Sequence, residues 1–411
     1  MTIAPSDLLL LNFLVEDKKP GAAPLDALLG RALRALRAYL SLEIAYISQS
    51  TPAGQVIRHL DAAPDCPGLF VGGRDPYEHA TCEPTDMSAS THICVPIELD
   101  DGVPYGTLTC TGSRSDIVLS QRDMSMIRVF AELAAEHIEA DIHAAARVRE
   151  STARIHEVIA GEGASLLYQP VYDVGRASIA GFEAFARFAG TPPRGPDVWF
   201  ADAARVGLET ALEARLIAKA MESFERLPEF AYIGFNVSPH IVLHGQLDRA
   251  FAGAPLERTV LEINGHLSIR QYDEMAKALR PMRDEGLRIS VDDAGGGVDS
   301  FRHILQLQPD IIKLHMSLVR NIDSDAARSA LASALIQFGK EQRCDVVAEG
   351  VETAAELSVL KAMGVVKMQG YLLGRPATLD KAAELCERTV ARRAPSAAPR
   401  RAAGATRLAS T

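Results

Sequence analysis

Short apolar runs alternate with longer stretches of helical apolar spacing over the second half of the chain. The stretches 208–227 and 324–342 repeat apolar residues every three or four positions, which predicts amphipathic helices. The runs are typical of strands and cover residues 179–188, 233–239, 259–264, 287–294, 310–314, 345–351 and 367–374. Strand–helix–strand repeats predict a parallel α/β barrel, in which the C-terminal ends of the strands converge on one rim.

Polar side chains stand at or near the ends of these runs. They are Glu183, Asn236, Glu262, Asp292, Asp293, Lys313, Glu349 and Gln369. A buried cluster of carboxylates is stable only where cations neutralise it. His315 is the one histidine or cysteine at these ends, so the oxygen-rich set favours Mg²⁺ or Mn²⁺ over Zn²⁺.

The adjacent aspartates indicate a reaction class. At the end of a strand Asp292 can bridge two metals while Asp293 reaches one, and two cations about 4 Å apart stabilise both the attacking and the leaving oxygen of a phosphodiester. An isolated Asp-Asp pair or strand-end lysine is more often plain surface. The joint order and spacing of the whole set favour a site here.

Several motifs carry a family resemblance. In order they are Tyr168-Gln169-Pro170-Val171, Glu183-Ala184-Phe185-Ala186-Arg187, Asn236-Val237-Ser238, Leu261-Glu262-Ile263, Val291-Asp292-Asp293, Ile312-Lys313, Ala348-Glu349-Gly350-Val351-Glu352-Thr353 and Gln369-Gly370-Tyr371. Over about residues 150–390 the chain resembles the EAL family of bacterial cyclic di-GMP phosphodiesterases. The resemblance implies a TIM-like (β/α)₈ barrel that hydrolyses cyclic di-GMP to linear pGpG.

The resemblance also implies roles for individual residues. One metal would lie among Glu183, Asn236, Glu262 and Asp292, and a second among Asp292, Asp293 and Glu349. Catalysis would involve Lys313, Glu349 and Gln369: Lys313 would orient or deprotonate the attacking water, and Gln369 would help to hold the hydrated site. Gln169, Phe185 and Arg187 would contact the dinucleotide.

The chain departs from the family pattern at four places. Phe185 replaces a leucine, Gly265 replaces a glutamate, and His315 replaces an aspartate. Residues 294–300 read Ala-Gly-Gly-Gly-Val-Asp-Ser where the family has Phe-Gly-Thr-Gly-Tyr-Ser-Ser, and consecutive glycines give this loop more conformational freedom. The retained polar residues favour an enzyme, and the altered loop favours an alternative: a barrel that binds cyclic di-GMP or a protein with weak catalysis or none.

Residues 1–145 predict a different domain. The pattern predicts a helix over 25–40 and strands over 43–50, 54–61, 91–99 and 103–111, and the Asp100-Asp101-Gly102 turn makes the last two a hairpin. This region resembles a GAF domain, a small α/β sensor. Only a short segment separates Cys82 from Cys94, where the family usually has a longer pocket cover, so we predict no cofactor there.

Apolar residues three or four apart over 120–159 predict a long helix. As a signalling helix it would pair two subunits of a homodimer and join the sensor to a barrel at 160–390. The alternative is a helix packed on the sensor and followed by a linker. Residues 391–411 are rich in Ala, Pro, Arg and Ser and predict a disordered tail.

Composition limits which partners, cellular location and cysteine chemistry we expect for the protein. A chain of 411 residues that is 47% hydrophobic can form two domain cores, and its net charge of −10 disfavours DNA or RNA polymers as partners. The longest apolar run, residues 8–15, is too short to span a bilayer and is flanked by acidic rather than basic residues, so we expect no transmembrane segment and a cytoplasmic location. Six cysteines without C-x-x-C spacing are expected to be reduced packing residues.

Overall fold

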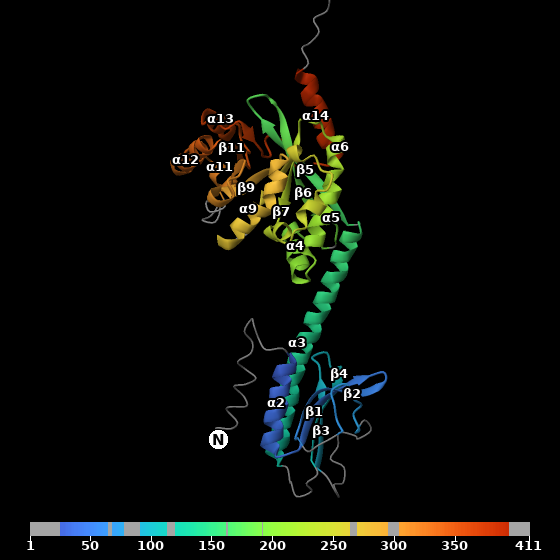
Figure 1. Cartoon of the computed structure of the whole chain (residues 1–411). Coiled ribbons are helices and arrows are strands. Elements are labelled where there is room, and N and C mark those ends of the chain that lie inside the picture. The colour runs from blue at the N-terminus through green and yellow to red at the C-terminus, as the bar shows by residue number, and fades with distance from the viewer. Residues whose placement is uncertain are drawn as a thin grey trace, which may run out of the picture. The chain divides into compact units, whose positions relative to one another are not determined.

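The computed structural model describes residues 25–64, 68–77, 91–112, 120–161, 163–190, 192–263, 269–294 and 304–393. They belong to two compact units, Met1–Arg149 and Glu150–Thr411 (Figure 1). Gly265, the loop 295–300, the tail from residue 394, Cys66, Cys82 and the side chain of Asp293 lie outside this description. Expectations for those positions therefore stay predictions.

The first unit contains one antiparallel sheet with helices on its apolar face. Its elements are α2 (Leu25–Leu40), β1 (Ile44–Thr51), β2 (Gly54–Ala62), β3 (Thr91–Glu98) and β4 (Pro104–Gly112), and the strand order is β2-β1-β4-β3. Ile47 and Leu108 pack with Leu29 and Leu36 of α2 in one core. At the tip of the predicted hairpin Gly102 has φ +76°, which favours glycine. The elements follow the prediction closely, and the GAF assignment stays a prediction.

Helix α3 (Gln121–Ala160) extends over 40 residues, as the apolar spacing predicted. Its Ile127, Phe130 and Ile138 are buried in the core of the first unit. Ile155 and Val158 are buried in a cluster of the second unit. The chain is therefore helical where the alternative placed a linker, and pairing with a second subunit stays a prediction.

The second unit contains a closed eight-stranded barrel with the order β10-β11-β12-β5-β6-β7-β8-β9. The strands are β5 (Ala164–Asp173), β6 (Ser178–Phe188), β7 (Tyr232–Val237), β8 (Thr259–Ile263), β9 (Arg288–Ala294), β10 (Ile311–Leu314), β11 (Asp345–Ala348) and β12 (Lys367–Met368). The helices are α4 (Pro196–Arg205), α5 (Glu209–Met221), α6 (Ser223–Arg226), α7 (Pro239–Leu243), α8 (Leu247–Ala250), η1 (Leu256–Arg258), α9 (Ile269–Asp284), α11 (Met316–Val319), α12 (Ala326–Gln342), α13 (Ala354–Ala362) and α14 (Leu379–Arg393).

The main core lies between the strands and the surrounding helices. Leu261 and Ile289 of the barrel are buried with Met275 of α9 and Leu335 of α12. Alternate residues of each strand point the other way, into the barrel, because strand side chains alternate between faces. The barrel interior can therefore carry polar residues while the outer layer supplies the apolar burial that stabilises the fold.

The prediction of an all-parallel barrel was wrong for β5. This strand pairs antiparallel with both β6 and β12, whereas β6 to β12 follow one another in parallel. Residues 174–177 join β5 to β6, and four residues can connect antiparallel neighbours but cannot form a crossover helix. The Asp173 carboxylate accepts the N–H of Arg176 at 2.7 Å and holds this turn.

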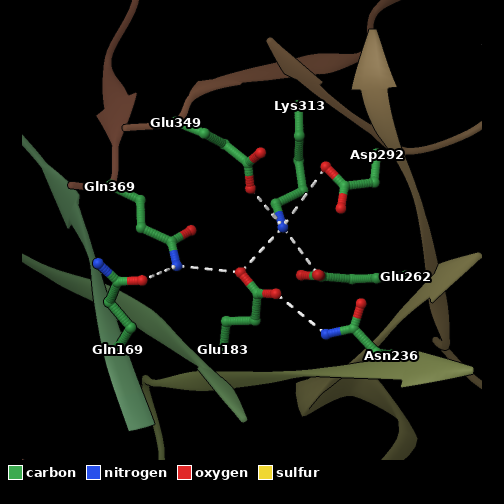
Figure 2. A network of polar contacts seen from close by, with 8 residues as sticks. All are labelled: Gln169, Glu183, Asn236, Glu262, Asp292, Lys313, Glu349 and Gln369. Atoms are coloured by element: carbon green, nitrogen blue, oxygen red, sulfur yellow. Dashed lines mark hydrogen bonds and ion pairs between the residues drawn. The ribbon is translucent and has the colours of Figure 1, made fainter. Parts of the chain in front are cut away.

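The strands predicted over 345–351 and 367–374 are shorter in the structure, because glycines turn the chain. Gly350 follows β11 with φ +67°. A Cβ on Gly370 would lie 2.2 Å from backbone atoms of Val351, so only glycine fits where these two loops cross. Glu349 and Gln369 consequently lie immediately after their strands, on the same rim of the barrel (Figure 2).

The structure bears on two further expectations, which concern membrane-spanning helices and the cysteines. Within the described part of the chain, no helix combines the length and apolar character needed to cross a membrane. Cys94, Cys110, Cys344 and Cys386 are reduced cysteines, and all but Cys94 are buried. These four cysteines match the expectation of reduced packing residues.

Candidate active site

The ammonium of Lys313 lies at the centre of a carboxylate cluster inside the barrel (Figure 2). Its Nζ is 2.9 Å from Glu183 Oε2, 2.7 Å from Glu262 Oε2, 2.6 Å from Glu349 Oε1 and 4.0 Å from Asp292 Oδ1. The side chains of Lys313, Glu183 and Glu262 are almost fully buried, whereas those of Asp292 and Glu349 are 18% and 17% exposed. The cluster is therefore open to solvent on the side of the last two.

Strand register brings these residues together. Asn236 of β7 stands opposite Glu262 of β8, and Glu183 of β6 stands opposite Gln169 of β5. Glu183 lies in the middle of its strand rather than at the end, because β6 continues past the rim to Phe188. A Cβ on Gly234 would lie 2.5 Å from Glu262 Oε1, so the absence of a side chain at this position makes room for the carboxylate.

Amide side chains surround the Glu183 carboxylate. Asn236 Nδ2 donates to Glu183 Oε1 at 3.0 Å, and Gln369 Nε2 donates to Glu183 Oε2 at 3.0 Å. Gln369 Nε2 also donates to Gln169 Oε1 at 3.1 Å, and Gln169 Nε2 donates to the carbonyl oxygen of Gly374 at 3.0 Å. The buried Gln369 Oε1 has no hydrogen-bond partner among the described residues, which marks a polar position that a water or ligand can satisfy.

The cluster carries more negative than positive charge. Burial and the charge of Glu183 raise the pKa of Glu262 well above its usual range. Burial also raises the pKa of Glu349, to about 8, although Lys313 opposes this shift. For Glu183, burial is outweighed by Lys313 and by hydrogen bonds, which lower its pKa. The carboxylates outweigh the burial of Lys313 and raise its pKa, so its side chain remains an ammonium.

These residues fit divalent cations in charge and in donor chemistry. Four carboxylates face one ammonium, so the cluster lacks positive charge. Carboxylate and amide oxygens are the donors that Mg²⁺ and Mn²⁺ prefer. Among the described residues no three His, Cys, Asp or Glu side chains are already arranged to hold a metal, since the Lys313 ammonium lies between the carboxylates.

A pocket of about 270 Å³ lies next to this cluster and includes the two remaining predicted ligand contacts, Phe185 and Arg187. Phe200, Glu213 and Asn236 also line it, and Asn236 connects it to Glu183 through their hydrogen bond. The exposed Arg187 donates to the carbonyl oxygen of Ala186 and lies 5.9 Å from the ring centroid of Phe185. The pocket thus combines an aromatic ring with a cation, a combination suited to an anionic nucleotide.

Sequence reasoning missed Glu213 of α5. Its carboxylate accepts hydrogen bonds from the backbone N–H of Ser238 at 3.2 Å and from the Ser238 hydroxyl at 3.0 Å. Ser238 lies two residues after Asn236. Glu213 also lines a second cavity of about 530 Å³ that shares Asn236 with the first. A carboxylate among the buried residues Leu212, Leu216 and Ile217 of an amphipathic helix was the signal that could have identified it.

Other singled-out residues lie in ordinary structural roles. His315 Nδ1 accepts the N–H of Ser317 and caps the short helix α11. His240 Nε2 lies 2.9 Å from Glu209 Oε1, and Glu352 pairs with Arg320 at 2.7 Å. The structure therefore brings together all of the predicted metal and catalytic residues except Asp293, whose side chain is outside the described part.

Comparison with known proteins identifies the family. The EAL domain family matches residues 152–376, which is more than half of the chain. The chain belongs to the EAL domain family. The EAL domain contains the barrel and every residue of the cluster drawn in Figure 2. The closed eight-stranded barrel that the resemblance implied is thus confirmed.

Similar proteins from two bacteria match about half of the chain. The probable cyclic di-GMP phosphodiesterase PdeD of Escherichia coli is 28% identical over 224 residues, which are 52% of this chain and 42% of PdeD. An uncharacterized signaling protein of Caulobacter vibrioides is 31% identical over 245 residues, which are 57% of this chain and 30% of that protein. The chain therefore spans less than half the length of these two relatives.

Solved structures confirm the fold. An EAL domain protein from Listeria monocytogenes aligns with a TM-score of 0.52 at 24% identity, over 57% of this chain and 96% of that chain. The phosphodiesterase PaMucR, solved as a complex with cyclic di-GMP, aligns with a TM-score of 0.51 at 23% identity, over 57% and 99% of the two chains. At these identities the likeness supports the barrel fold alone.

Proposed function

We propose that the EAL domain is a metal-dependent phosphodiesterase that hydrolyses cyclic di-GMP to linear pGpG. The observation that carries this proposal is the cluster around Lys313, in which four carboxylates and an amide converge beside a pocket with an aromatic ring and an arginine. The matching relative PdeD, described as a probable cyclic di-GMP phosphodiesterase, supports the same reaction.

The proposed metals are Mg²⁺ or Mn²⁺, held by Glu183, Asn236, Glu262, Asp292, Asp293 and Glu349. When bound, two such cations neutralise the carboxylates and stabilise the charge that develops on the attacking and leaving oxygens. The donor set and the lack of positive charge in the cluster support this choice of cations.

Lys313 and Glu349 would act on the attacking water in different ways. A lysine ammonium has three donors and no acceptor, so Lys313 orients the water and does not deprotonate it. Glu349 has a carboxylate oxygen 2.6 Å from Lys313 Nζ and a side chain that is 17% exposed, so it is placed to accept a proton from a water at the solvent side of the cluster. Gln369, bonded to Glu183, would supply its buried Oε1 to the hydrated site.

Substrate would bind in the pocket lined by Phe185 and Arg187. The guanidinium of Arg187 would pair with a phosphate, and the ring of Phe185 would pack on a base. Gln169 would reach the dinucleotide from β5, although its amide is engaged by Gly374 and Gln369 in the structure described here. The positive charge of Arg187 would offset, at the pocket, the net charge of −10 of the chain.

The remaining proposals concern the rest of the chain. The first unit would be a GAF-like sensor that regulates the barrel through α3, in a homodimer paired along this helix and located in the cytoplasm. Apolar residues exposed on α3, Ile142 and Val148, support pairing, because a helix in contact with a partner buries such side chains.

The alternative is an EAL domain that binds cyclic di-GMP without turning it over. The departures at Gly265 and in the 294–300 loop favour it, whereas the intact cluster around Lys313 favours the enzyme. The two functions differ in whether product forms once ligand is bound.

A product assay separates them. Purified full chain is incubated with cyclic di-GMP and Mg²⁺ or Mn²⁺, and pGpG is followed by chromatography. We expect product from the wild type and from Glu352→Gln, an exposed glutamate paired with Arg320, and none from Glu183→Gln. Equal traces of pGpG from wild type and Glu183→Gln would contradict the enzyme, and binding of cyclic di-GMP in Ca²⁺ would then support the alternative.

A further inference from the structure

The Lys313 ammonium is surrounded by three carboxylates. Nζ lies 2.9, 2.7 and 2.6 Å from single oxygens of Glu183, Glu262 and Glu349 (Figure 2). It donates hydrogen bonds to Glu183 and Glu262 and forms an ion pair with Glu349. Lys313 therefore already acts as the counter-cation at the centre of the cluster.

The carboxylate oxygens are engaged as well. Glu183 Oε2 accepts from both Lys313 and Gln369, and Glu183 Oε1 accepts from Asn236. A Mg²⁺ ion approaches its oxygen ligands to about 2.1 Å, closer than any of these contacts. A divalent cation shared by Glu183 and Glu262 would thus lie beside the ammonium, where two positive charges repel each other.

The cluster has one direction in which Lys313 can move. The side chains of Glu183 and Glu262 are each 4% exposed, whereas those of Asp292 and Glu349 are 18% and 17% exposed. Asp292 Oδ1 lies 4.0 Å from Nζ, just beyond hydrogen-bond distance. A short movement toward solvent would therefore exchange Glu183 and Glu262 for Asp292 while one carboxylate contact is kept.

We propose that Lys313 is an exchangeable internal cation, which pairs with Glu183, Glu262 and Glu349 before metal binds and moves toward Asp292 and solvent when a divalent cation takes its place. This inference rests on the proposed metal-dependent function and deepens it, because one lysine then serves two states. In the first it holds the acidic site together, and in the second it stands at the solvent side of the cluster, where it can orient a water.

Lysine labelling measures the exchange directly. Full-length wild-type protein in chelator, or saturated with Mn²⁺, is treated with an acetylating ester, and the acetylation rates of individual lysines are read by mass spectrometry. The exposed Lys361 of α13 is the internal reference. We expect Lys313 to react at least tenfold more slowly than Lys361 in chelator, since it is buried and retains its proton. With Mn²⁺ its rate should rise at least fivefold while that of Lys361 stays constant.

Calorimetry with Mn²⁺ provides the second measurement. Lys313→Met has no ammonium to displace, so we expect it to bind Mn²⁺ at least tenfold more tightly than the wild type. Wild type that binds Mn²⁺ while Lys313 labelling stays unchanged overturns the exchange and leaves the metal-dependent function standing. Failure of the wild type to bind Mn²⁺ or Mg²⁺ overturns both. The labelling result is obtained on the native chain, so it decides the matter even where Lys313→Met does not fold.

Discussion

Glu183 Oε2 and Lys313 Nζ lie 2.9 Å apart in the barrel, although 130 residues separate the two in the chain. The pair is buried, and a buried ion pair requires that its charges be balanced. Three further carboxylates share the same ammonium, so the cluster is stable only if carboxyl groups keep protons or cations bind. Function and stability are therefore opposed at this site.

Glu262→Gln should not destabilise the protein in the absence of metal. Burial and the charge of Glu183 raise the pKa of Glu262 well above its usual range, so a negative charge at this position is costly, and a neutral amide of the same shape removes that cost. Denaturation in chelator, followed by the fluorescence of Trp199, the only tryptophan, should give a free energy of unfolding equal to or above that of the wild type. Mn²⁺ should raise the free energy of unfolding of the wild type, and this rise should be absent in Glu262→Gln. A large loss of stability in chelator would show that the contact of Glu262 with Lys313 outweighs the cost of burying its charge.

Gly234→Ala should impair the reaction more than the fold. The added Cβ would meet Glu262 Oε1 at 2.5 Å, so the carboxylate must turn away from Lys313. We expect the rate of pGpG formation to fall by about 10- to 100-fold, as when the support of a metal ligand is altered. Gly30→Ala is the control, because its added Cβ would meet no atom of another described element within 4 Å, and it should leave the rate unchanged. Full activity of Gly234→Ala would show that the position of Glu262 is not critical.

Glu213 should make stability depend on pH. Burial raises its pKa from 4.5 to about 7, so between these values the folded state keeps a proton that the unfolded state has released. The free energy of unfolding therefore falls by up to about 3 kcal/mol as pH rises through this window, and it levels off above the window. Glu213→Gln, whose amide can still bond both groups of Ser238, should lack this fall. Denaturation at pH 5 and pH 8 tests it, and parallel pH profiles for both proteins would refute the assignment.

Arg187→Ala should weaken substrate binding more than turnover. Arg187 is exposed beside Phe185 at the pocket, and removal of one phosphate contact should raise KM about tenfold with a smaller change in kcat. Arg176→Ala, in the β5–β6 turn next to Asp173, is a matched control and should leave both constants unchanged. A drop in kcat with KM unchanged would place Arg187 at the reacting phosphate instead.

The sequence predicted the polar cluster better than the strands that carry it. Glu183, Glu262 and Lys313 could be recognised because apolar runs around them identify strands, and the order of the motifs identifies a family. The reversed direction of β5 follows from the four-residue turn after Asp173, a local feature that the repeat of strands and helices does not show. The ends of β11 and β12 were placed too late, because the close approach of Gly370 to Val351 is a tertiary contact.

The spacing of residues in the sequence could not predict which side chains contact one another. The hydrogen bond between Glu213 and Ser238 joins a helix to the end of a strand 25 residues later in the chain, and no periodic pattern in the sequence predicts it. The central position of Lys313 follows from the competition of four carboxylates for one ammonium, which depends on side-chain geometry inside the closed barrel.

The most direct test of the account is a metal titration of product formation. Chelator-treated full chain is mixed with cyclic di-GMP and increasing Mn²⁺, and the initial rate of pGpG formation is measured for the wild type and for Glu262→Gln. The account predicts no product without metal, a rate that rises to saturation with Mn²⁺ in the wild type, and no rise in Glu262→Gln. A wild-type rate that is independent of Mn²⁺, or equal saturation curves for both proteins, would contradict the assignment of the cluster around Lys313 as the catalytic site.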